Sequence, residues 1–449
     1  RDWSSDVCSS DLRFFIAEPL ADRMEAKLPR DYDEGRLGRL KRRIFIMKKA
    51  LSLAIAAVLA FSLTACGNSG STAPESSAAP ESSAAAESVA EPESSEAAAE
   101  TTEAGNDALK IAIVSSPSGV DDGSFNEDNY NGILSFIGKH PSSTVTPVKE
   151  PTGDTAAAVQ AVADIVADYD VIVCCGFQFA GITQVAQDNP DVAFILVDAF
   201  PADAEGQDTE VDNIYAMQFK EQESGFFAGM AAALETKSNK VAVVNGIAYP
   251  SNVNYQYGFE CGVKYVNETD GKSVEIVELP SYAGTDVTGV NVGGNYIGSF
   301  ADAATGKVVG NALIDEGVDI MFVAAGDSGN GVFTAAKEAE GVYVIGCDVD
   351  QYDDGANGDA NVILTSGLKV MSTNVDKALE TIADGSFAGG NVTLGADTDS
   401  TGYVSASGRC QLSADTITKL DAAYEKVKAG DIVPAANFNG ITPDDFTVE

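Results

Sequence analysis

The chain has 449 residues, a formal net charge of −40 and 45% hydrophobic residues. This length allows two or three domains, and the apolar fraction is normal for a globular protein. The strong negative charge argues against a nucleic-acid partner, because phosphate binding requires a basic surface.

The first 46 residues lack the periodicity of a folded segment. Residues 1–12, RDWSSDVCSSDL, resemble the in-frame translation of a sequencing adapter. Arg42 and Arg43 lie just upstream of Met47 and fit a ribosome-binding site read as codons. We therefore expect residues 1–46 to be an artefact and exclude them from the fold prediction.

A secretory signal peptide is predicted at residues 47–65. Two lysines after Met47 precede an apolar run and then small residues in front of Cys66, which is the layout of such a peptide. The apolar run has about 16 residues, fewer than the roughly 20 that span a bilayer. Leu-Thr-Ala-Cys at 63–66 resembles a bacterial lipobox, so we expect a lipid on Cys66.

Residues 66–108 are expected to form a lipidated acidic tether that starts at Cys66. The segment after Cys66 consists mainly of Ala, Ser, Pro, Thr and Glu and contains no Lys or Arg. It has almost nothing to bury, and its like charges repel one another, so we expect a disordered, self-repelling tether. This predicts a protein that is lipid-anchored at the cell membrane, on the extracytoplasmic face.

After the tether, short runs rich in Val and Ile alternate with amphipathic helical patterns. Strands are predicted at residues 109–115, 144–149, 171–175, 192–198, 213–219, 240–245, 273–279, 318–324, 342–347 and 361–365. Helices are predicted at residues 128–138, 155–167, 221–235, 297–316, 329–340 and 367–383. Continuous apolar strands that alternate with helices indicate parallel sheets covered on both faces. Roughly 340 residues with this many strands exceed one core, so two doubly wound α/β lobes are predicted.

The histidine and cysteine counts argue against metal or triad chemistry. His140 is the only histidine, and its position before Pro141 suits a helix end. We therefore expect no metal site, no cofactor and no Ser-His-Asp triad. Five cysteines follow Cys66 without any Cys-x-x-Cys spacing, and we interpret most of them as small apolar residues, with a disulfide between two of them left open. They are Cys174, Cys175, Cys261, Cys347 and Cys410.

Polar and Gly-rich clusters follow several predicted strands, where ligands of open α/β sheets bind. They lie at residues 119–126, 197–200, 325–331, 348–350 and 365–369. Carboxylates can accept hydrogen bonds from vicinal hydroxyls, asparagine can bond a base edge, and aromatic rings can stack on a planar ring. This set suits a ligand with a sugar and a ring, although each Asp, Ser or Asn also suits a turn or a helix cap.

Six sequence blocks resemble the basic membrane protein family of substrate-binding lipoproteins, whose best-known branch is the purine nucleoside receptor. The resemblance covers about residues 109–405. The blocks are DDGSFN at 121–126, FKEQESGFFAGMAA at 219–232, GSFADAATGKVVGNALIDEGVDIMF at 298–322, AAGDSGNGV at 324–332, GCDVDQ at 346–351 and ILTSGLKVMSTNVDKAL at 363–379. Because the blocks occur in the family's order, the resemblance is far more specific than any single block.

The resemblance implies a type I periplasmic-binding fold, in which two Rossmann-like lobes are joined by a three-stranded hinge. Closure of the lobes would trap a ligand, as a population shift towards the state that binds better. The hinge is expected near residues 218–221, 364–368 and 388–392. The lobes are expected at 109–219 with 366–390, and at 220–365 with 391–449.

The resemblance further implies a monomeric binding protein without enzymatic activity. It would capture a nucleoside, in first place a purine nucleoside, and deliver it to the permease and ATPase subunits of an ABC importer. One alternative keeps the fold and the role but takes a sugar or another small polar metabolite. Another is a Rossmann-like enzyme. A regulator of the lactose-repressor type would need a basic helix-turn-helix before residue 109, where the chain is acidic.

Carried over by motif, polar residues of these blocks are expected to bind the ligand. Asp121 and Asn126 would bond the base, with Asp198 opposite. Asp348 would bind the ribose hydroxyls. Two further charged residues are expected near the ribose end: Glu223 and Lys369.

Aromatic and Gly-rich positions complete the expected site. Phe125 or Tyr130 would stack on one side of the base, and Phe322 on the other. Gly326 and Asp327 lie where family members usually read AGGTG, so Asp327 adds a carboxylate beside the pocket. This departure bears on which ligand is bound rather than on the binding role.

Overall fold

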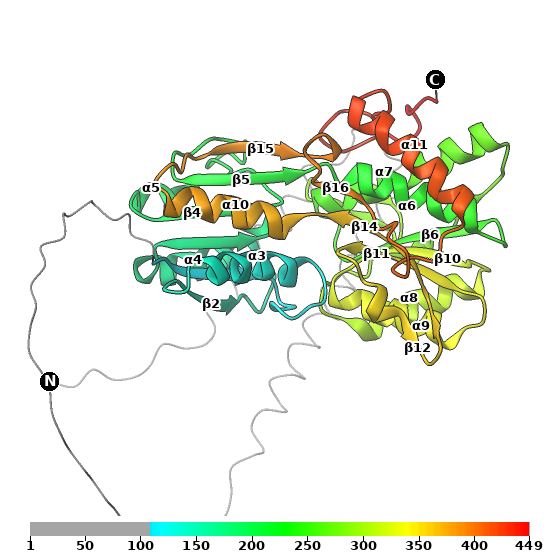
Figure 1. Ribbon diagram of the computed structural model, residues 1–449, viewed down its shortest axis with the longest axis horizontal. Coiled ribbons are helices and arrows are strands. Elements are labelled where there is room, and N and C mark those ends of the chain that lie inside the picture. The colour runs from blue at the N-terminus through cyan, green and yellow to red at the C-terminus, as the bar shows by residue number, and fades with distance from the viewer. Residues whose placement is uncertain (1–107, 449) are drawn as a thin grey trace, which may run out of the picture. The chain divides into compact units, whose positions relative to one another are not determined.

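The computed structural model describes residues 108–448. The predictions for residues 1–46, for the signal peptide at 47–65, for the lipid on Cys66 and for nearly all of the tether lie outside these described residues. Two six-stranded sheets are each covered by helices on both faces (Figure 1). We name the sheet that contains β1, together with its helices, the first lobe, and the other sheet with its helices the second lobe.

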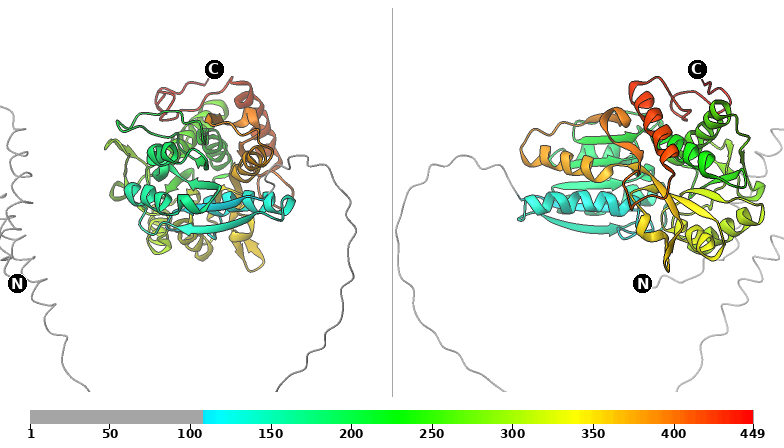
Figure 2. Two further views of the ribbon diagram at one scale, coloured as in Figure 1. Left: turned by 90° about the vertical axis from the view of Figure 1, so that its left-hand side faces the viewer. Right: turned by 45° about the vertical axis from the view of Figure 1, so that its right-hand side comes forward.

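The first lobe is built on a parallel sheet with the strand order β15-β5-β4-β3-β1-β2. Its strands are β1 (Lys110–Ser115), β2 (Thr144–Lys149), β3 (Val171–Cys175), β4 (Ala193–Val197), β5 (Ile214–Phe219) and β15 (Gly390–Leu394). Helices α3 (Phe125–Lys139) and α10 (Met371–Ala383) lie side by side on one face (Figures 1 and 2), and α4 (Thr155–Ile165) and α5 (Thr183–Asp188) cover the other. Because both faces are covered, every residue of β3 is buried.

The second lobe has the strand order β16-β14-β11-β10-β6-β7, in which β16 runs antiparallel to β14. Its strands are β6 (Lys240–Asn245), β7 (Glu275–Ile276), β10 (Ile320–Ala324), β11 (Tyr343–Asp348), β14 (Ile363–Lys369) and β16 (Thr401–Tyr403). Helices α6 (Glu221–Glu235), α7 (Pro250–Asp270) and α11 (Ala414–Ala429) pack on one face, and α8 (Ala303–Asp315) and α9 (Asp327–Glu338) on the other. Two small hairpins are added: β8 (Gly284–Thr285) with β9 (Asn291–Gly293), and β12 (Ala356–Asn357) with β13 (Ala360–Asn361).

The two sheets repeat one plan, so β4 of the first lobe corresponds to β11 of the second. All ten predicted strands are present, with ends that differ by a few residues. Two helix predictions start too early. The helix predicted from residue 297 begins at Ala303, where the Asp302 carboxylate caps it by accepting from the Thr305 amide, and residues 367–369 belong to β14 rather than to α10.

The sequence prediction missed α7 and α11. On α7 the side chains of Asn252, Asn254 and Gln256 are buried together with apolar ones, so the apolar residues do not follow one helical stripe. A close helix contact explains this burial. A Cβ atom on Gly229 of α6 would lie 2.1 Å from the carbonyl oxygen of Phe259, so only glycine lets the two helices approach this closely.

The chain crosses between the lobes three times. The first crossing joins β5 to α6 at 219–221, the second joins β14 to α10 at 369–371, and the third joins β15 to β16 at 394–401. The second and third crossings lie a few residues after the positions expected at 364–368 and 388–392. The expected boundaries place residues 366–369 in the first lobe and residues 391–394 in the second. Strands β14 and β15 continue through these residues, so each segment belongs to the other lobe.

Candidate ligand-binding site

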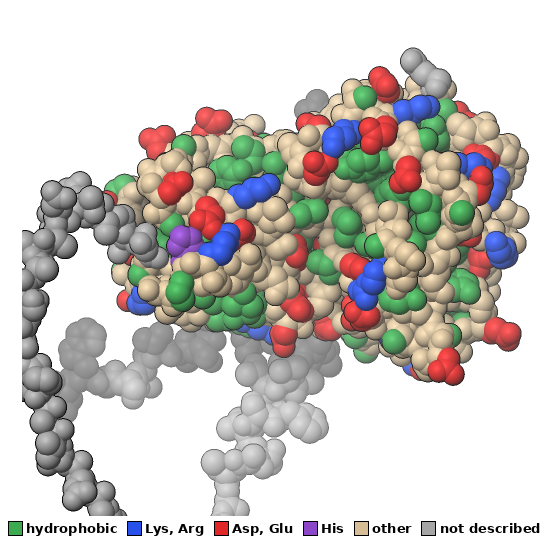
Figure 3. Space-filling view, viewed as in Figure 1, with side chains coloured by type: hydrophobic (Ala, Val, Ile, Leu, Met, Phe, Trp, Pro, Cys, Tyr) green, Lys and Arg blue, Asp and Glu red, His purple; other side chains and the backbone are tan. Residues whose placement is uncertain are grey.

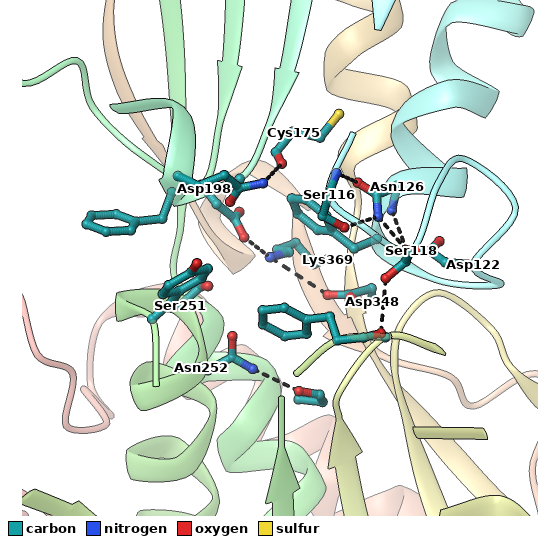
Figure 4. A pocket seen from close by; sticks show the side chains of 18 of the residues that line it. Ser116, Ser118, Asp122, Asn126, Cys175, Asp198, Ser251, Asn252, Asp348 and Lys369 are labelled. Carbon is teal, nitrogen blue, oxygen red and sulfur yellow. Dashed lines mark hydrogen bonds and ion pairs between the residues drawn. The ribbon is translucent and has the colours of Figure 1, made fainter. Parts of the chain in front are cut away.

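The carboxyl ends of the strands in both lobes face a shared cavity (Figure 4). Counted together with the open space at its mouth, the cavity has a volume of about 560 Å³. It is lined by Ser116, Ser118, Asp122, Phe125, Asn126, Cys175, Gly176, Phe177, Gln178, Asp198, Tyr249, Ser251, Asn252, Tyr255, Phe300, Ala324, Gly326, Asp348 and Lys369. Both lobes thus contribute polar and aromatic side chains to one cavity.

A buried lysine lies among carboxylates at the floor of the cavity. The Lys369 ammonium, at the end of β14, is 2.6 Å from Asp198 Oδ2, 3.6 Å from Glu221 Oε1 and 3.8 Å from Asp348 Oδ1. Its side chain is only 2% exposed. These carboxylates raise the pKa of Lys369 well above its usual value, although burial alone would lower it. The carboxylates therefore favour the charged form of the lysine, and Figure 4 shows it between Asp198 and Asp348.

The two aspartates occupy equivalent places in the two lobes. Asp198 follows β4 and Asp348 ends β11, and both have a left-handed backbone, with φ of 65° and 68°. This conformation is unfavourable for residues with a Cβ atom and is concentrated at functional sites. Both aspartates therefore hold the same rarely adopted backbone conformation, and both carboxylates line one cavity.

The two carboxylates differ in the hydrogen bonds that they accept from the protein. Asp348 accepts hydrogen bonds from the Tyr255 hydroxyl (2.8 Å) and the Ser124 hydroxyl (3.0 Å). Asp198 Oδ1 is buried and has no hydrogen-bond partner among residues 108–448, although Ser251 lies near enough to favour its charged form. Burial raises the pKa of Asp198, against the opposing effect of Lys369. An unpaired buried carboxylate oxygen is costly, so this atom is suited to accept a ligand hydrogen bond.

Aromatic rings line the cavity at two places. The Phe125 ring lies with its centroid 4.8 Å from the Lys369 ammonium. Elsewhere Phe177 of the first lobe packs on Tyr249 of the second (centroids 5.5 Å apart), and Tyr249 packs on Phe300 (5.9 Å). These rings offer apolar faces to a planar ligand group.

Direct contacts between the lobes close the cavity. Ser118 Oγ donates to the carbonyl oxygen of Phe300 (3.0 Å), and Gln351 Nε2 donates to that of Gly123 (3.3 Å). Together with the bond from Ser124 to Asp348, these contacts join the first-lobe loop after β1 to the second lobe. The described conformation is therefore a closed one.

Comparison with known proteins identifies the family. The sequence pattern of the Bmp family, described as "ABC transporter substrate-binding protein PnrA-like", matches residues 109–278 and 287–435. The chain belongs to this family. The resemblance to basic membrane proteins is thereby confirmed, and the Bmp protein described here is an ABC transporter substrate-binding protein.

Relatives agree with this assignment. The Bmp protein is 30% identical over 338 residues to "CD4+ T-cell-stimulating antigen" of Listeria innocua, which covers 72% of this chain and 87% of the relative. It is 30% identical over 305 residues to "ABC transporter nucleoside-binding protein BmpA" of Lactococcus lactis, which covers 63% of this chain and 78% of the relative. A crystal structure of an ABC transporter solute-binding protein from Aeropyrum pernix K1 superimposes with a TM-score of 0.62 at 23% identity, over 75% of this chain and 95% of that one. This likeness confirms the predicted type I periplasmic-binding fold.

Six of the eleven expected site residues of the Bmp protein line the cavity: Phe125, Asn126, Asp198, Gly326, Asp348 and Lys369. Asn126 does not point free donors at a ligand, since its amide group donates to Ser116 Oγ (2.9 Å) and Asp122 Oδ2 (2.7 Å). Asp122 in turn accepts from backbone amides at the start of α3. The loop after β1 therefore uses these two side chains mainly as a helix cap, which the sequence had left open as an alternative.

The other five expected residues lie away from the cavity. Asp121 is exposed, because its neighbour Asp122 takes the inward position. Tyr130 is one helical turn beyond Asn126 and packs on the first-lobe core, and Phe322 is fully buried in β10 against Phe259. Glu223 accepts from Thr401 Oγ1 and the Ala396 amide at the third crossing, and Asp327 accepts from Asn330 at the start of α9.

The sequence prediction missed the contribution of α7 and of two loops. Tyr249, Ser251 and Tyr255 come from the start of α7, whose helical pattern was not detected. Phe177 follows β3, and its Cys-Cys-Gly-Phe context gave no polar signal. Phe300 lies inside the segment expected to be helical, whereas it belongs to the loop before α8.

Neither a metal-binding group nor a disulfide is formed among the described residues. Between residues 108 and 448, no group of three His, Cys, Asp or Glu side chains is arranged to hold a metal ion, and no helix is long and apolar enough to cross a membrane. The five cysteines in this range are free thiols, so the disulfide that the sequence left open is not formed. On the face seen in Figure 3, acidic and basic side chains are interspersed over both lobes.

Proposed function

We propose that the Bmp protein captures a nucleoside, a purine nucleoside in first place, between its two lobes and delivers it to the permease and ATPase subunits of an ABC importer. It would act as a monomer at the extracytoplasmic face of the membrane, held there by a lipid on Cys66. The protein would bind its ligand without changing it chemically. The printed name of the Lactococcus lactis relative, a nucleoside-binding protein, supports the ligand class.

The observation that carries this proposal is the pair of strained aspartates. Asp198 and Asp348 reach the same lysine from different lobes, and Asp198 Oδ1 has no hydrogen-bond partner among residues 108–448. Vicinal hydroxyls of a ribose are neutral donors with the spacing that paired carboxylate oxygens accept. We therefore assign the sugar to this end of the cavity.

The aromatic rings favour a planar base over a second sugar. Phe177, Tyr249 and Phe300 form a continuous run of rings that both lobes contribute to. Stacking of a base on aromatic side chains is worth about 1–3 kcal/mol per base. A sugar or another small polar metabolite remains the second candidate, because carboxylates alone serve it equally well.

Ligand-induced stabilisation tests the ligand class. The chain from residue 67 onwards would be melted with inosine, guanosine, adenosine or a free pentose. At a ligand concentration of 100 times Kd, binding to the native state adds about 2.7 kcal/mol to the free energy of unfolding. A rise in Tm with nucleosides alone supports the proposal, whereas a rise with a pentose or hexose and none with nucleosides would replace it by the second candidate.

The site assignment is tested by Asp198→Asn. Asparagine tolerates the left-handed backbone but loses the charge, and a hydrogen bond to a charged group contributes about 1.5–3 kcal/mol. Nucleoside affinity should therefore fall at least tenfold. Asp399→Asn is the matched control, because Asp399 has φ of 54° but lies outside the cavity, at the third crossing.

A further inference from the structure

The charges at the cavity floor do not balance. One ammonium, on Lys369, lies within 4 Å of three carboxylates: those of Asp198, Glu221 and Asp348. None of the four side chains is more than 10% exposed. If all were ionised, the group would hold two excess negative charges in a space from which water is largely excluded, which is unfavourable. Retention of a proton by one carboxylate relieves part of this excess.

Geometry points to Glu221 as the carboxylate that holds the proton. Asp198 makes a direct 2.6 Å bond to Lys369, and Asp348 accepts two hydroxyl donors. Glu221 accepts a single side-chain hydrogen bond, from Asn254 Nδ2 (3.0 Å), and its other oxygen is 3.6 Å from Lys369. Its ionised form is therefore the least stabilised of the three.

The surroundings of Glu221 come from several elements. Lys369 of β14 and Asp198 after β4 carry the charges nearest to it, and Asp348 and Tyr255 lie beyond them. The pKa of Glu221 is raised to about 7, mainly by burial; the charge of Lys369 opposes this rise and the charge of Asp198 adds to it. Glu221 does not line the cavity, so it acts on a ligand only through Lys369 and the aspartates.

We propose that Glu221 is a positioning residue that takes up one proton when the lobes close over a nucleoside, so that affinity falls as pH rises through neutrality. Glu221 lies at the first crossing and Lys369 at the second, so their contact joins two of the segments about which the lobes move. Lobe opening admits water to the cavity floor, which stabilises the ionised form of Glu221. The inference rests on the proposed nucleoside ligand.

The sign follows from linkage. The closed state binds the proton more tightly than the open state, so acid favours the closed, ligand-bound form. With a pKa of about 7 when closed and an ordinary value of about 4.5 when open, one linked proton makes affinity roughly tenfold higher at pH 6 than at pH 8. Below pH 4.5 and well above pH 7 the affinity should no longer change for this reason.

Calorimetric titration with inosine tests the coupling. Wild type measured in two buffers of different ionisation enthalpy should take up close to one proton per ligand at pH 6 and almost none at pH 8. Glu221→Gln should bind with one affinity at both pH values and without proton uptake, because the amide oxygen keeps the bond from Asn254. Glu221→Asp keeps a titratable group and should retain a pH dependence.

Glu260→Gln is the matched control. Burial raises the pKa of Glu260 to about 7 as well, but this residue is bonded to Gln256 outside the cavity. The variant should keep the tenfold dependence of wild type. A flat affinity profile in wild type, or an unchanged profile in Glu221→Gln, would overturn the inference.

A ligand-independent measurement separates this inference from the proposed function. Carbon-13 NMR of glutamate-labelled closed protein should show a carboxyl that titrates near pH 7 and disappears in Glu221→Gln but not in Glu260→Gln. If no nucleoside binds at any pH, the proposed function fails. If nucleosides bind but no carboxyl signal near pH 7 disappears in Glu221→Gln, only the role of Glu221 is refuted. The absence of this signal overturns the role of Glu221 for any ligand.

Discussion

Removal of the buried positive charge is the strongest single test of the cavity floor. Lys369→Met keeps an unbranched side chain of similar length but leaves Asp198, Glu221 and Asp348 without a counter-charge. The lysine side chain is 2% exposed, so water cannot replace the ammonium without opening the cavity. Loss of one partner from a buried ion pair costs about 3–5 kcal/mol.

The cost should depend on pH in a defined direction. Burial already raises the pKa of Asp198 and Glu221, and loss of the lysine raises both further. A carboxyl whose pKa is higher in the native state than in the unfolded state contributes stability that is present at low pH and lost as pH rises. The variant should therefore be about 3–5 kcal/mol less stable than wild type at pH 8 and much closer to it at pH 5.

Urea unfolding of the chain from residue 67, followed by circular dichroism, measures this difference. Lys110→Met is the control, because Lys110 is an exposed lysine that also lies over an aromatic ring, that of Tyr169. Its loss should change the free energy of unfolding by no more than about 0.5 kcal/mol. If Lys369→Met lowers the free energy of unfolding by less than 1 kcal/mol at pH 8, or by equal amounts at pH 5 and pH 8, the three carboxylates do not form a buried group with excess negative charge.

Three further predictions concern helix packing and the charge of Glu221. Gly229→Ala should destabilise the protein by at least about 2 kcal/mol in urea unfolding, because its Cβ atom would lie 2.1 Å from the Phe259 carbonyl oxygen; a cost below 1 kcal/mol would contradict the close α6–α7 contact. Gly138→Ala, on the exposed side of α3 with no atom within 4 Å of the new Cβ, should instead stabilise by about 0.5 kcal/mol through helix propensity, and a loss would contradict the open space there. In saturating inosine, which keeps the lobes closed, Glu221→Gln should unfold with about 1–3 kcal/mol more free energy than wild type at pH 8 and with no gain at pH 4.5, because the raised pKa of Glu221 removes stability as pH rises from about 4.5 to 7. An equal gain at both pH values would show that the charge of Glu221 is not responsible.

The strand pattern was predictable because buried parallel strands leave a simple signal. Segments such as 171–175 are apolar throughout, because a strand that is covered by helices on both faces is buried on both sides. The boundaries of the crossings were less predictable. Strand β14 continues through Gly367 to Lys369 with polar residues, since its end serves the cavity rather than the core.

The site residues at strand ends were predictable from the sequence, whereas those on helix α7 were not. Asp198, Asp348 and Lys369 each end a strand that the sequence reveals, so topology alone brings them together. Tyr255 reaches the same point from α7, five residues into a helix whose buried face includes Asn252, Asn254 and Gln256. Its position depends on the glycine contacts with α6, which no local pattern discloses.

The repeat of one plan in both lobes gives the cavity a property that neither lobe has alone. Asp198 belongs to the first lobe, whereas Lys369 ends a strand of the second, so their 2.6 Å bond links the two lobes in the closed state. The same holds for the bond from Ser124 to Asp348. The protein therefore supplies part of the free energy of closure itself, and the excess negative charge around Lys369 opposes closure. A ligand that donates to Asp198 Oδ1 and fills the cavity therefore favours the closed state, because a population shift requires differential rather than absolute affinity.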